Sequence, residues 1–513
     1  MSYGAYHPEG FSGECDAALP QCVKDLASVL DRAQRQFAYD TLRLNRNDLK
    51  EVAGVLVDFA VDIHNDIDMW NAYERYNVEF FGVPLSLTTK TKPQGIHEDR
   101  IRHLLWKLYP EMISGLILSP QHQDLQHVAT AAKHFLNARI PVLPQDAGVK
   151  AFLATPNEHG WDVKQKLVWT GTRSYLFRMC FKNYIAERNN GVADIPNTDA
   201  FICQECTGWS GLGVIDLLAE TLDITQSERR ELRSWYEPHL APYRVLSING
   251  DVIKALNLAN KEPYTIRVGV NRHSFKVGEV VLGSLTPWRS TWYWSGQQHL
   301  LGTVDEGMVD DIVNTMRRKS SHILCRYWKE YERRIREAAA RHHQSTMAYH
   351  KTDLAVYADA VDMAADWQKE MRRMWDAAPQ DLVQDVIMRY GLKKGRPNIS
   401  LPDDLVDSSN GIAVFANPEE GKEITPDYND IVSGLKRCGE SLTEAQATAI
   451  RGFVTADAIS PAFVKRVTAE HGAESIKAAF MLGKCDEGFW LDYLLRSHKG
   501  HFYRKRYPPI STV

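Results

Sequence analysis

The segment YRVLSINGDVIKALNL (residues 243–258) decides the fold class, because here the apolar residues change from a period near 3.6 to a period of 2. Asn249-Gly250 divides the segment into two alternating runs, and this dipeptide is typical of a two-residue hairpin turn. Three further runs follow at regular spacing: YTIRVGV (264–270), VVLGSLTPW (280–288) and WYWSG (292–296). The pattern predicts five short strands that close into a small SH3-like or OB-like barrel, because closure removes unpaired strand edges.

Helical periodicity surrounds this barrel, so the predicted fold class is mainly α with a small β-barrel, a multi-domain α+β protein. Before the barrel, Ser119-Pro120 predicts a helix start, residues 163–187 predict one long helix, and Thr225 with Glu228 predicts a capping box. After the barrel, residues 306–343 and 352–378 predict an antiparallel helix pair.

The C-terminal part mixes signals for strands and helices. Residues 412–415 predict a strand, which the acidic turn 417–421 follows. Helices are expected over 428–438 and from Ser460-Pro461 to Gly472, and Ser441 with Glu444 has the spacing of a capping box. We therefore expect four parts: a helical domain (1–237), the barrel (240–305), a long helical pair (306–390) and a small mixed α/β or helical C-terminal domain with a basic tail (391–513).

The composition is that of an ordinary globular protein, with 44% hydrophobic and 25% charged residues among 513. The 65 acidic and 61 basic residues give a formal net charge of -4, so nucleic-acid contact would need local basic patches. No apolar run approaches the ~20 residues of a membrane span, and the N-terminus lacks the pattern of a secretory signal. The eight cysteines are scattered, which favours reduced thiols. We expect a cytoplasmic protein without membrane contact.

Two constellations of the helical domain have the spacing of metal or redox sites. Cys203 and Cys206 form a C-x-x-C, but no second ligand pair with similar spacing accompanies them, so structural thiols are the favoured interpretation. A helix would align Asp58, Asp62 and Asp66 on one face. Metal sites in helical bundles usually need Glu-x-x-His pairs on facing helices, and a solvated acidic face is therefore favoured here.

Two further motifs give equally little support to catalysis. His122, His127 and His134 fall on one predicted helix, but no carboxylate at helical spacing completes a metal triad. Residues 208–213 (GWSGLG) resemble a phosphate loop superficially, and a turn into the helix VIDLLAETL is favoured. No G-x-S-x-G, H-E-x-x-H, Walker or kinase signature is present. We expect no metal, no cofactor and no catalytic residue.

Two basic stretches and one aromatic face are the candidates for nucleic-acid contact. Between Arg317 and Arg341 nine basic residues stand against three acidic ones, and after Asp492 basic and aromatic residues interleave without an acid. Basic side chains can follow a phosphate backbone, and exposed rings can stack on bases. The alternatives are a solvated helix face, a tail pinned to acidic patches, and rings that fill the barrel core. The candidate nucleic-acid-binding residues are Arg333, Arg334, Arg336, Arg504, Lys505, Arg506, Trp292 and Trp294.

Several segments resemble a bacterial family described as a domain of unknown function. They are YRVLSINGDVIKALNL (243–258), FKVGEVVLGSLTPWRSTWYWSGQQ (275–298), KGRPNISLPDDL (394–405), NGIAVFANPEEGKEI (410–424) and, in the helical part, FAVDIHNDIDMWNAYERYNVEFFGVPL (59–85). The resemblance covers most of the chain, and its motifs of Trp, Gly and Pro are typical of a fold rather than of catalysis. It implies the architecture above and a bacterial, cytoplasmic setting, and it carries over no activity.

The leading hypothesis from the sequence is a non-enzymatic, multi-domain binding protein whose barrel and basic helix and tail engage DNA or RNA. The alternative is a protein-interaction or regulatory scaffold that uses the barrel, the acidic turn 417–421 and the helical domain as contact surfaces. A metal-dependent enzyme comes third, because only a metal bound at the cysteine or histidine sets would support it.

Overall fold

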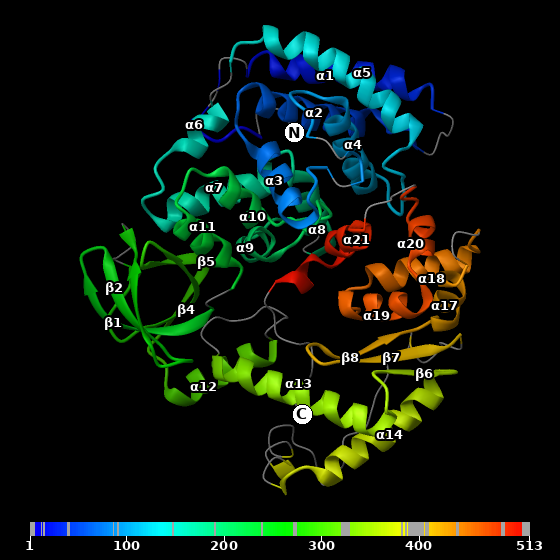
Figure 1. Ribbon diagram of the computed structural model, residues 1–513. Coiled ribbons are helices and arrows are strands. Elements are labelled where there is room, and N and C mark those ends of the chain that lie inside the picture. The colour runs from blue at the N-terminus through cyan, green and yellow to red at the C-terminus, as the bar shows by residue number, and fades with distance from the viewer. Residues whose placement is uncertain are drawn as a thin grey trace. The chain divides into compact units, whose positions relative to one another are not determined.

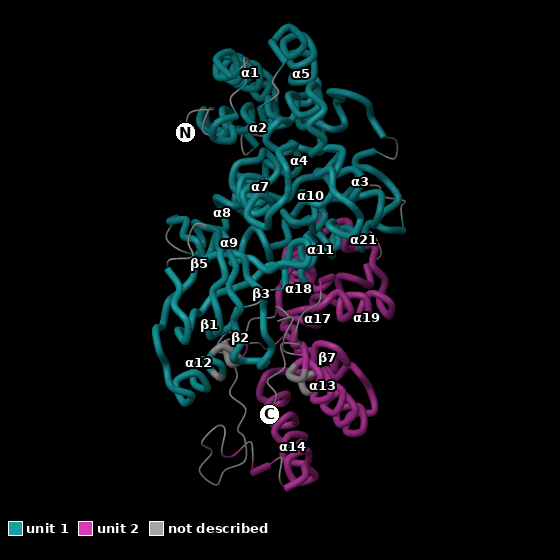
Figure 2. The backbone as a smooth tube through the Cα atoms, turned by 90° about the vertical axis from the view of Figure 1, so that its left-hand side faces the viewer, with its two compact units in different colours: residues 1–327, 481–501 teal, residues 328–480, 502–513 magenta. Residues whose placement is uncertain are grey.

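The computed structural model divides the chain into two compact units (Figure 2). The structure describes residues 6–11, 13, 16–37, 42–85, 87–89, 92–145, 148–188, 191–237, 240–269, 274–319, 329–380, 383–384, 387, 405, 410–437, 441–483 and 488–504. Unit 1 comprises residues 1–327 and 481–501, and unit 2 comprises residues 328–480 and 502–513. The chain therefore leaves unit 1, builds unit 2 and returns to add a last helix to unit 1. Among the described residues, no helix combines the length and apolar character that crossing a membrane requires.

Unit 1 consists of helices with one small barrel at their side, which confirms the predicted fold class of mainly α with a small β-barrel (Figure 1). Its helices are α1 Leu19–Gln34, α2 Arg46–His64, α3 Met69–Phe81, α4 Glu98–Met112, α5 Gln123–Arg139, α6 Gly148–Ala154, α7 Gly160–Arg173, α8 Arg178–Arg188, α9 Ile195–Gln204, α10 Val214–Thr221, α11 Gln226–Arg233, α12 Glu306–Lys319 and α21 Trp490–Lys499. The 3-10 turns η3 Ile140–Val142 and η4 Ser234–Tyr236 follow α5 and α11, and η6 Gly500–Tyr503 follows α21.

The helix boundaries of unit 1 show where local sequence signals decide and where packing does. The capping box of Thr225 and Glu228 is confirmed at the start of α11. The single helix predicted over 163–187 is wrong, because the chain breaks between α7 and α8, where the consecutive residues Tyr175, Leu176 and Phe177 are all buried. The helix start predicted at Ser119-Pro120 is also wrong, since α5 begins after His122, whose Nδ1 accepts a hydrogen bond from the Asp124 N–H.

The barrel predicted between residues 240 and 305 is confirmed as five strands: β1 Ala241–Asn249, β2 Val252–Asn257, β3 Pro263–Arg267, β4 Val280–Trp288 and β5 Thr291–Gly302. The strands close in the order β1-β2-β3-β5-β4, with β1 antiparallel to β4 and β3 parallel to β5. A two-residue hairpin turn is present but lies one residue later than predicted: Asn249 pairs with Val252, so the turn residues are Gly250, with φ +62°, and Asp251. Inward-facing residues such as Ile253, Ala255 and Ile266 are fully buried.

The outer side of β4 and β5 packs on the helices of unit 1. Helices α7 and α9 contact β5, and α11 contacts β4. Trp288 is fully buried and donates its indole N–H to the carbonyl oxygen of Asn157 at 2.8 Å, while Trp235 donates to that of Pro287 at 2.8 Å. The ring of Tyr293 lies against Gly160, where an added Cβ would come within 2.6 Å of it. This side of the barrel is therefore covered by protein.

Helix α21 completes unit 1 from the C-terminal part of the chain. The Tyr493 ring packs edge-on against Phe81 and lies stacked at 6.0 Å from the Trp106 ring. At Gly211, whose φ is +76°, an added Cβ would lie 2.5 Å from the carbonyl oxygen of Arg496. Only glycine therefore allows α21 to approach this closely.

Unit 2 is built around a three-stranded antiparallel sheet with helices on both faces. Its elements are α13 Lys329–His350, β6 Leu354–Tyr357, α14 Ala360–Ala377, β7 Ile412–Asn417, β8 Gly421–Thr425, α17 Tyr428–Leu435, α18 Glu444–Thr455, α19 Pro461–His471 and α20 Glu474–Ala479. The strand order is β6-β7-β8. Ile412 and Val414 of β7 pack on α14, whereas Phe415 stacks on Phe463 of α19, so the two helices lie on opposite faces.

Predictions for unit 2 were correct where short sequence signals act locally. The strand at 412–415, the helix start at Ser460-Pro461 and its end at Gly472 are confirmed. The helix predicted over 352–378 is wrong at its beginning, because residues 354–357 form strand β6, which pairs with β7. The capping box predicted for Ser441 and Glu444 is displaced, since Thr443 caps α18 and Gln446 completes the box.

Candidate nucleic-acid interface

Trp292 and Trp294 are both half-buried and belong to the aromatic lining of the barrel. Trp292 packs edge-on against Tyr264, with ring centroids 5.1 Å apart. Trp294 packs edge-on against Tyr243 at 5.5 Å and stacks on Phe275 at 6.2 Å. The two indoles therefore contact rings from other strands and loops of the same barrel, as the alternative interpretation of core-filling rings requires.

The outer face of β1, β2 and β3 carries one basic side chain in each cross-strand row. Register places Lys254 between Ser247 and Thr265, and Lys254 and Thr265 are exposed. The next row holds half-buried Arg267 opposite Val252. Because rows on one face are two residues apart, these two rows lie about 6.6–6.8 Å apart along the strands.

The third row of this face is partly covered. Arg244 stands opposite Leu256, and Leu256 packs against the buried cluster that includes Val309 and Val313 of α12. The open part of the face is therefore centred on Lys254 and extends toward the exposed turn 249–251.

Ion pairs hold Arg267 on this face and Arg289 in the β4–β5 turn. Arg267 forms an ion pair with Asp251, Nε to Oδ2 3.2 Å, and its Nη1 contacts the Nδ1 of His159 at 3.1 Å. In the β4–β5 turn, Arg289 forms an ion pair with Glu228 of α11 at 2.6 Å. The β4–β5 turn is thus held by a helix, whereas the β1–β2 turn is solvent-exposed.

The basic helix α13 carries two of the predicted contacts in exposed positions, but each faces a carboxylate of the same helix. Arg333 Nη1 lies 2.5 Å from Glu337 Oε1, and Arg336 Nε lies 3.1 Å from Glu332 Oε1. These i, i+4 pairs reduce the positive field along this part of α13. The Arg334 side chain lies outside the described part of the structure, although its backbone belongs to α13.

The predicted site residues are divided between the units. Trp292 and Trp294 belong to unit 1, whereas Arg333, Arg336 and Arg504 belong to unit 2. Arg504 is half-buried. Lys505 and Arg506 lie outside the described residues, as does the stretch 320–328 within the basic region.

The solvated acidic face predicted for Asp58, Asp62 and Asp66 is wrong for the first two, whereas Asp66 is exposed and lies beyond the end of α2. Asp62 is buried and accepts hydrogen bonds from the N–H groups of Met69 and Trp70 at 3.2 and 2.8 Å, and from the Tyr175 hydroxyl at 2.6 Å. Burial raises the pKa of Asp62 to about 6, and these hydrogen bonds partly oppose the shift. Asp58 is bound by Arg178. Both carboxylates therefore connect helices.

A buried row of hydrogen-bonded side chains, which the sequence patterns did not predict, crosses the helical part of unit 1. His103 of α4 contacts Thr88 Oγ1 through Nδ1 and the Tyr73 hydroxyl through Nε2, each at 2.8 Å, and that hydroxyl lies 3.2 Å from Ser210 Oγ. Burial, and then the positive charges of Lys107 and Arg102, lower the pKa of His103, so its ring is neutral.

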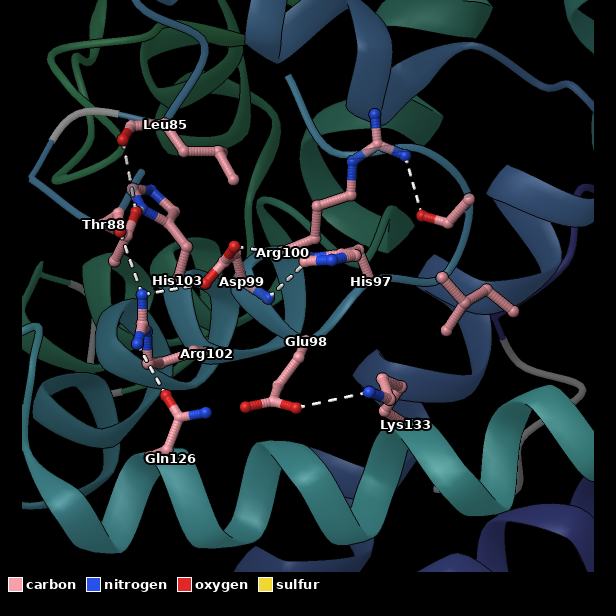
Figure 3. Close-up of polar contacts among 12 residues, drawn as sticks. Leu85, Thr88, His97, Glu98, Asp99, Arg100, Arg102, His103, Gln126 and Lys133 are labelled. Carbon is pink, nitrogen blue, oxygen red and sulfur yellow. Dashed lines mark hydrogen bonds and ion pairs between the residues drawn. The ribbon is translucent and has the colours of Figure 1, made fainter. Parts of the chain in front are cut away.

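These hydrogen-bonded residues form a structural network and do not line an open site. His103 and Ser210 have no exposed surface, so a substrate cannot reach them without local opening. On the exposed side of α4, Arg102 contacts Asp99 and Gln126 and donates to the Thr88 carbonyl oxygen, which ties α4 to α5 (Figure 3). Arginine and histidine on one helix at this spacing were readable in the sequence, but their partners lie far away in the chain.

The predicted metal candidates are not gathered into a site. His122 caps α5 through its ring nitrogen, and His127 and His134 are exposed. Cys203 lies in the last turn of α9, and Cys206 follows the helix. Within the described residues, no group of three or more His, Cys, Asp or Glu side chains has an arrangement that could hold a metal ion. Residues 208–213 lead into α10, as the favoured interpretation stated.

Comparisons with protein-family models, with curated proteins and with solved structures found no match to this chain.

Proposed function

We propose that the protein is a non-enzymatic, multi-domain nucleic-acid-binding protein whose barrel contacts single-stranded DNA or RNA. The observation that carries this proposal is the barrel topology together with the face that it leaves open. The order β1-β2-β3-β5-β4 with a parallel β3–β5 pair corresponds to the OB-like alternative. In OB barrels the β2–β3 face and the β1–β2 and β4–β5 loops bind oligonucleotides.

The exposed face has suitable chemistry for a flexible phosphate backbone. Lys254 and Arg267 supply positive charge in neighbouring rows, and the hydroxyl of Thr265 lies beside Lys254. The opposite side of the barrel is packed on α7, α9 and α11, which leaves the β2–β3 side for a ligand. Because the formal net charge of the chain is -4, such local positions rather than the overall field would determine binding.

The tail and the basic helix would add phosphate contacts without sequence preference. Arg504, Lys505 and Arg506 are consecutive, and Arg333 and Arg336 are exposed on α13. For the α13 arginines, binding would have to replace the glutamate partners by phosphate oxygens.

The test is fluorescence anisotropy with labelled single-stranded DNA and RNA of about 12–16 nucleotides at about 50 mM salt, the most permissive condition for counterion release. Lys254→Ala should weaken binding to all sequences and lower the salt slope by about one contact. Replacing Arg504, Lys505 and Arg506 together by alanine should lower it by up to about three. Lys24→Ala is the matched control, because it removes an exposed lysine from α1, away from the barrel.

Binding that is absent at this salt concentration for both DNA and RNA would refute the proposal. Equal losses for Lys24→Ala and Lys254→Ala would also refute it, because they would show a response to net charge rather than to the barrel face.

A protein-interaction scaffold is the second candidate, and one cavity of unit 2 favours it. The cavity has a volume of about 440 Å³ and is lined by Leu354 and Val356 of edge strand β6 and by residues of α17 and α19, including Tyr428 and Arg466. Val356 is 52% exposed on this edge. An extended peptide could add to such an edge as a further strand. Selection from a displayed peptide library would test this candidate, because Val356→Lys should abolish binding of the selected peptides.

A further inference from the structure

A cluster of reactive side chains lies in unit 1 where α7 and α9 meet β5. Lys164 of α7 points its Nζ at the Sγ of Cys203, 3.4 Å away, and at the Oγ of Ser295, 3.0 Å away. The same ammonium forms an ion pair with Asp199, which lies one helical turn before Cys203 on α9. Ser295 also donates to Asp199 at 3.3 Å. One amine, one thiol and one carboxylate are thus held together by three elements.

Lys164 places a positive charge beside the thiol of Cys203. Burial disfavours the charged form of Lys164, but the neighbouring Cys203 and Asp199 outweigh this effect and raise the pKa of the amine. An adjacent ammonium stabilises a thiolate, and the thiolate is the nucleophilic form of cysteine. Cys203 itself is 6% exposed, while the side chains of Lys164 and Asp199 are 18% and 23% exposed, so a small oxidant meets the cluster at its edge.

The chain contains a second thiol in the opposite electrostatic setting. Cys180 of α8 lies 3.7 Å from the carboxylate of Glu111. Burial and then this negative charge raise the pKa of Cys180 well above its usual value, which keeps the thiol protonated. Cys180 is therefore an internal reference for a cysteine that lacks activation.

We propose that Lys164 and Cys203 form a peroxide-responsive cross-linking site. In the first step the Cys203 thiolate attacks one oxygen of hydrogen peroxide, the O–O bond breaks, and a sulfenic acid forms. The hydroxide that leaves takes the ammonium proton of Lys164, which gives the first water and a neutral amine. In the second step this amine attacks the oxidised sulfur. An N–S bond forms, the S–O bond breaks, and hydroxide leaves as the second water with the proton released from nitrogen.

The balance of this reaction is one thiol, one amine and one hydrogen peroxide giving one sulfenamide and two waters. The sulfur loses two electrons and the peroxide gains them. Sulfenic acids are known to condense with thiols and with backbone nitrogen, and the lysine amine here occupies the position of such a partner. Reduction by an excess of thiol returns Cys203 and Lys164 to their starting forms.

The link would join α7 to α9 directly beneath β5. Ser295 already contacts both Lys164 and Asp199, and an added Cβ at Gly296 would lie 2.9 Å from the Asp199 carboxylate. Oxidation would therefore fasten the helices on which the barrel rests. This role is independent of what the opposite side of the barrel binds.

The experiment treats the full-length Cys206→Ala protein with hydrogen peroxide and analyses it by intact and tandem mass spectrometry. Removing Cys206 excludes a Cys203–Cys206 disulfide, which would show the same loss of two hydrogens. The expected result is a peptide containing Lys164 joined to a peptide containing Cys203, with both released by dithiothreitol. Cys203 should react about tenfold faster than Cys180, because an ammonium lies beside Cys203 whereas a carboxylate lies beside Cys180.

Two substitutions of Lys164 separate its two roles. Lys164→Arg keeps the positive charge but removes the nucleophilic amine, so Cys203 should still be oxidised and should remain a sulfenic acid that a 1,3-diketone traps. Lys164→Met removes the charge and should slow the oxidation of Cys203 about tenfold. Far-ultraviolet circular dichroism checks that each variant is folded. The proposal is overturned if folded Cys206→Ala protein gives no Lys164–Cys203 link, or if Cys180 reacts as fast as Cys203.

Discussion

Replacing Trp294 by alanine should destabilise the barrel by about 3–5 kcal/mol, the cost of removing a large aromatic side chain from a packed core. The indole contacts Tyr243 and stacks on Phe275, and an added Cβ at Gly283 would lie 2.9 Å from its ring. Its N–H is buried and makes no hydrogen bond with the described residues, so the substitution removes packing and no hydrogen bond. At a urea dependence near 3 kcal/mol per molar, the unfolding midpoint should fall by about 1–2 M.

The assay is urea unfolding followed by tryptophan fluorescence, which reports mainly on unit 1 because most tryptophans lie there. Trp294→Phe keeps a ring in the same place and should cost less than about 1.5 kcal/mol. Both variants are then tested for binding of single-stranded oligonucleotide under conditions where they are folded. An unchanged midpoint for Trp294→Ala, combined with lost oligonucleotide binding, would refute the interpretation of Trp294 as a core ring and would restore the stacking role.

A double-mutant cycle tests the contact between the Trp294 ring and Gly283 of the neighbouring strand β4. Gly283→Ala forces a methyl group against the indole and should cost about 1–3 kcal/mol. In the Trp294→Ala background the space is open, so the same change should cost little. Additive costs would show that the two positions do not touch.

Three further changes test other parts of the structure. Arg100→Met should lower the free energy of unfolding by about 3–5 kcal/mol, because Arg100 and Glu74 form a buried ion pair with two contacts of 2.8 Å. In the same urea titration, the exposed Arg35→Ala should lower it by at most about 1 kcal/mol. Asp62 has a pKa of about 6 in the folded state, against 3.8 for a fully solvated aspartate, so the folded state holds this proton more tightly. The free energy of unfolding should therefore fall by about 3 kcal/mol as pH rises from about 4 to 6. The same fall in Asp62→Asn would contradict this cause. Gly452→Ala should raise the thermal midpoint of unit 2 and add about 0.5–1 kcal/mol, because this exposed helical position has nothing within 4 Å of an added Cβ.

The barrel could be predicted because its signals are local. Alternating runs and an Asn-Gly turn specify strands and a hairpin within a few residues of each other, and the structure contains them at nearly the predicted positions. The order in which the strands close could not be predicted, because the parallel pairing of Ile266 with Trp292 is a long-range choice.

Two of the failed predictions share a cause, since tertiary contacts overrode a helical pattern. The break before α8 places Tyr175 where its hydroxyl reaches Asp62, which lies far earlier in the chain. Strand β6 exists because residues 354–357 pair with residues 412–415. Neither partner could be identified from the segment itself.

The candidate sites also include some contacts that the sequence predicts and others that only the fold reveals. The i, i+4 spacing of Arg333 and Glu337 was visible in the sequence, and their ion pair on α13 follows from it. The spacing of Asp199 and Cys203 was equally visible, but the amine that gives the pair its chemistry comes from Lys164 on a different helix. Side-chain clusters built from several elements need the fold before they can be recognised.

The return of residues 481–501 to unit 1 has a consequence for the newly made chain. Unit 2 has an uninterrupted segment, 328–480, whose sheet and helices can form as soon as it is synthesised, whereas the core of unit 1 lacks α21 until that synthesis is complete. Until then, the surfaces of Phe81 and Trp106 that Tyr493 later covers are open to other apolar chains. Unit 1, most of which is translated first, is therefore the unit that matures last, and during that interval it should depend most on chaperones.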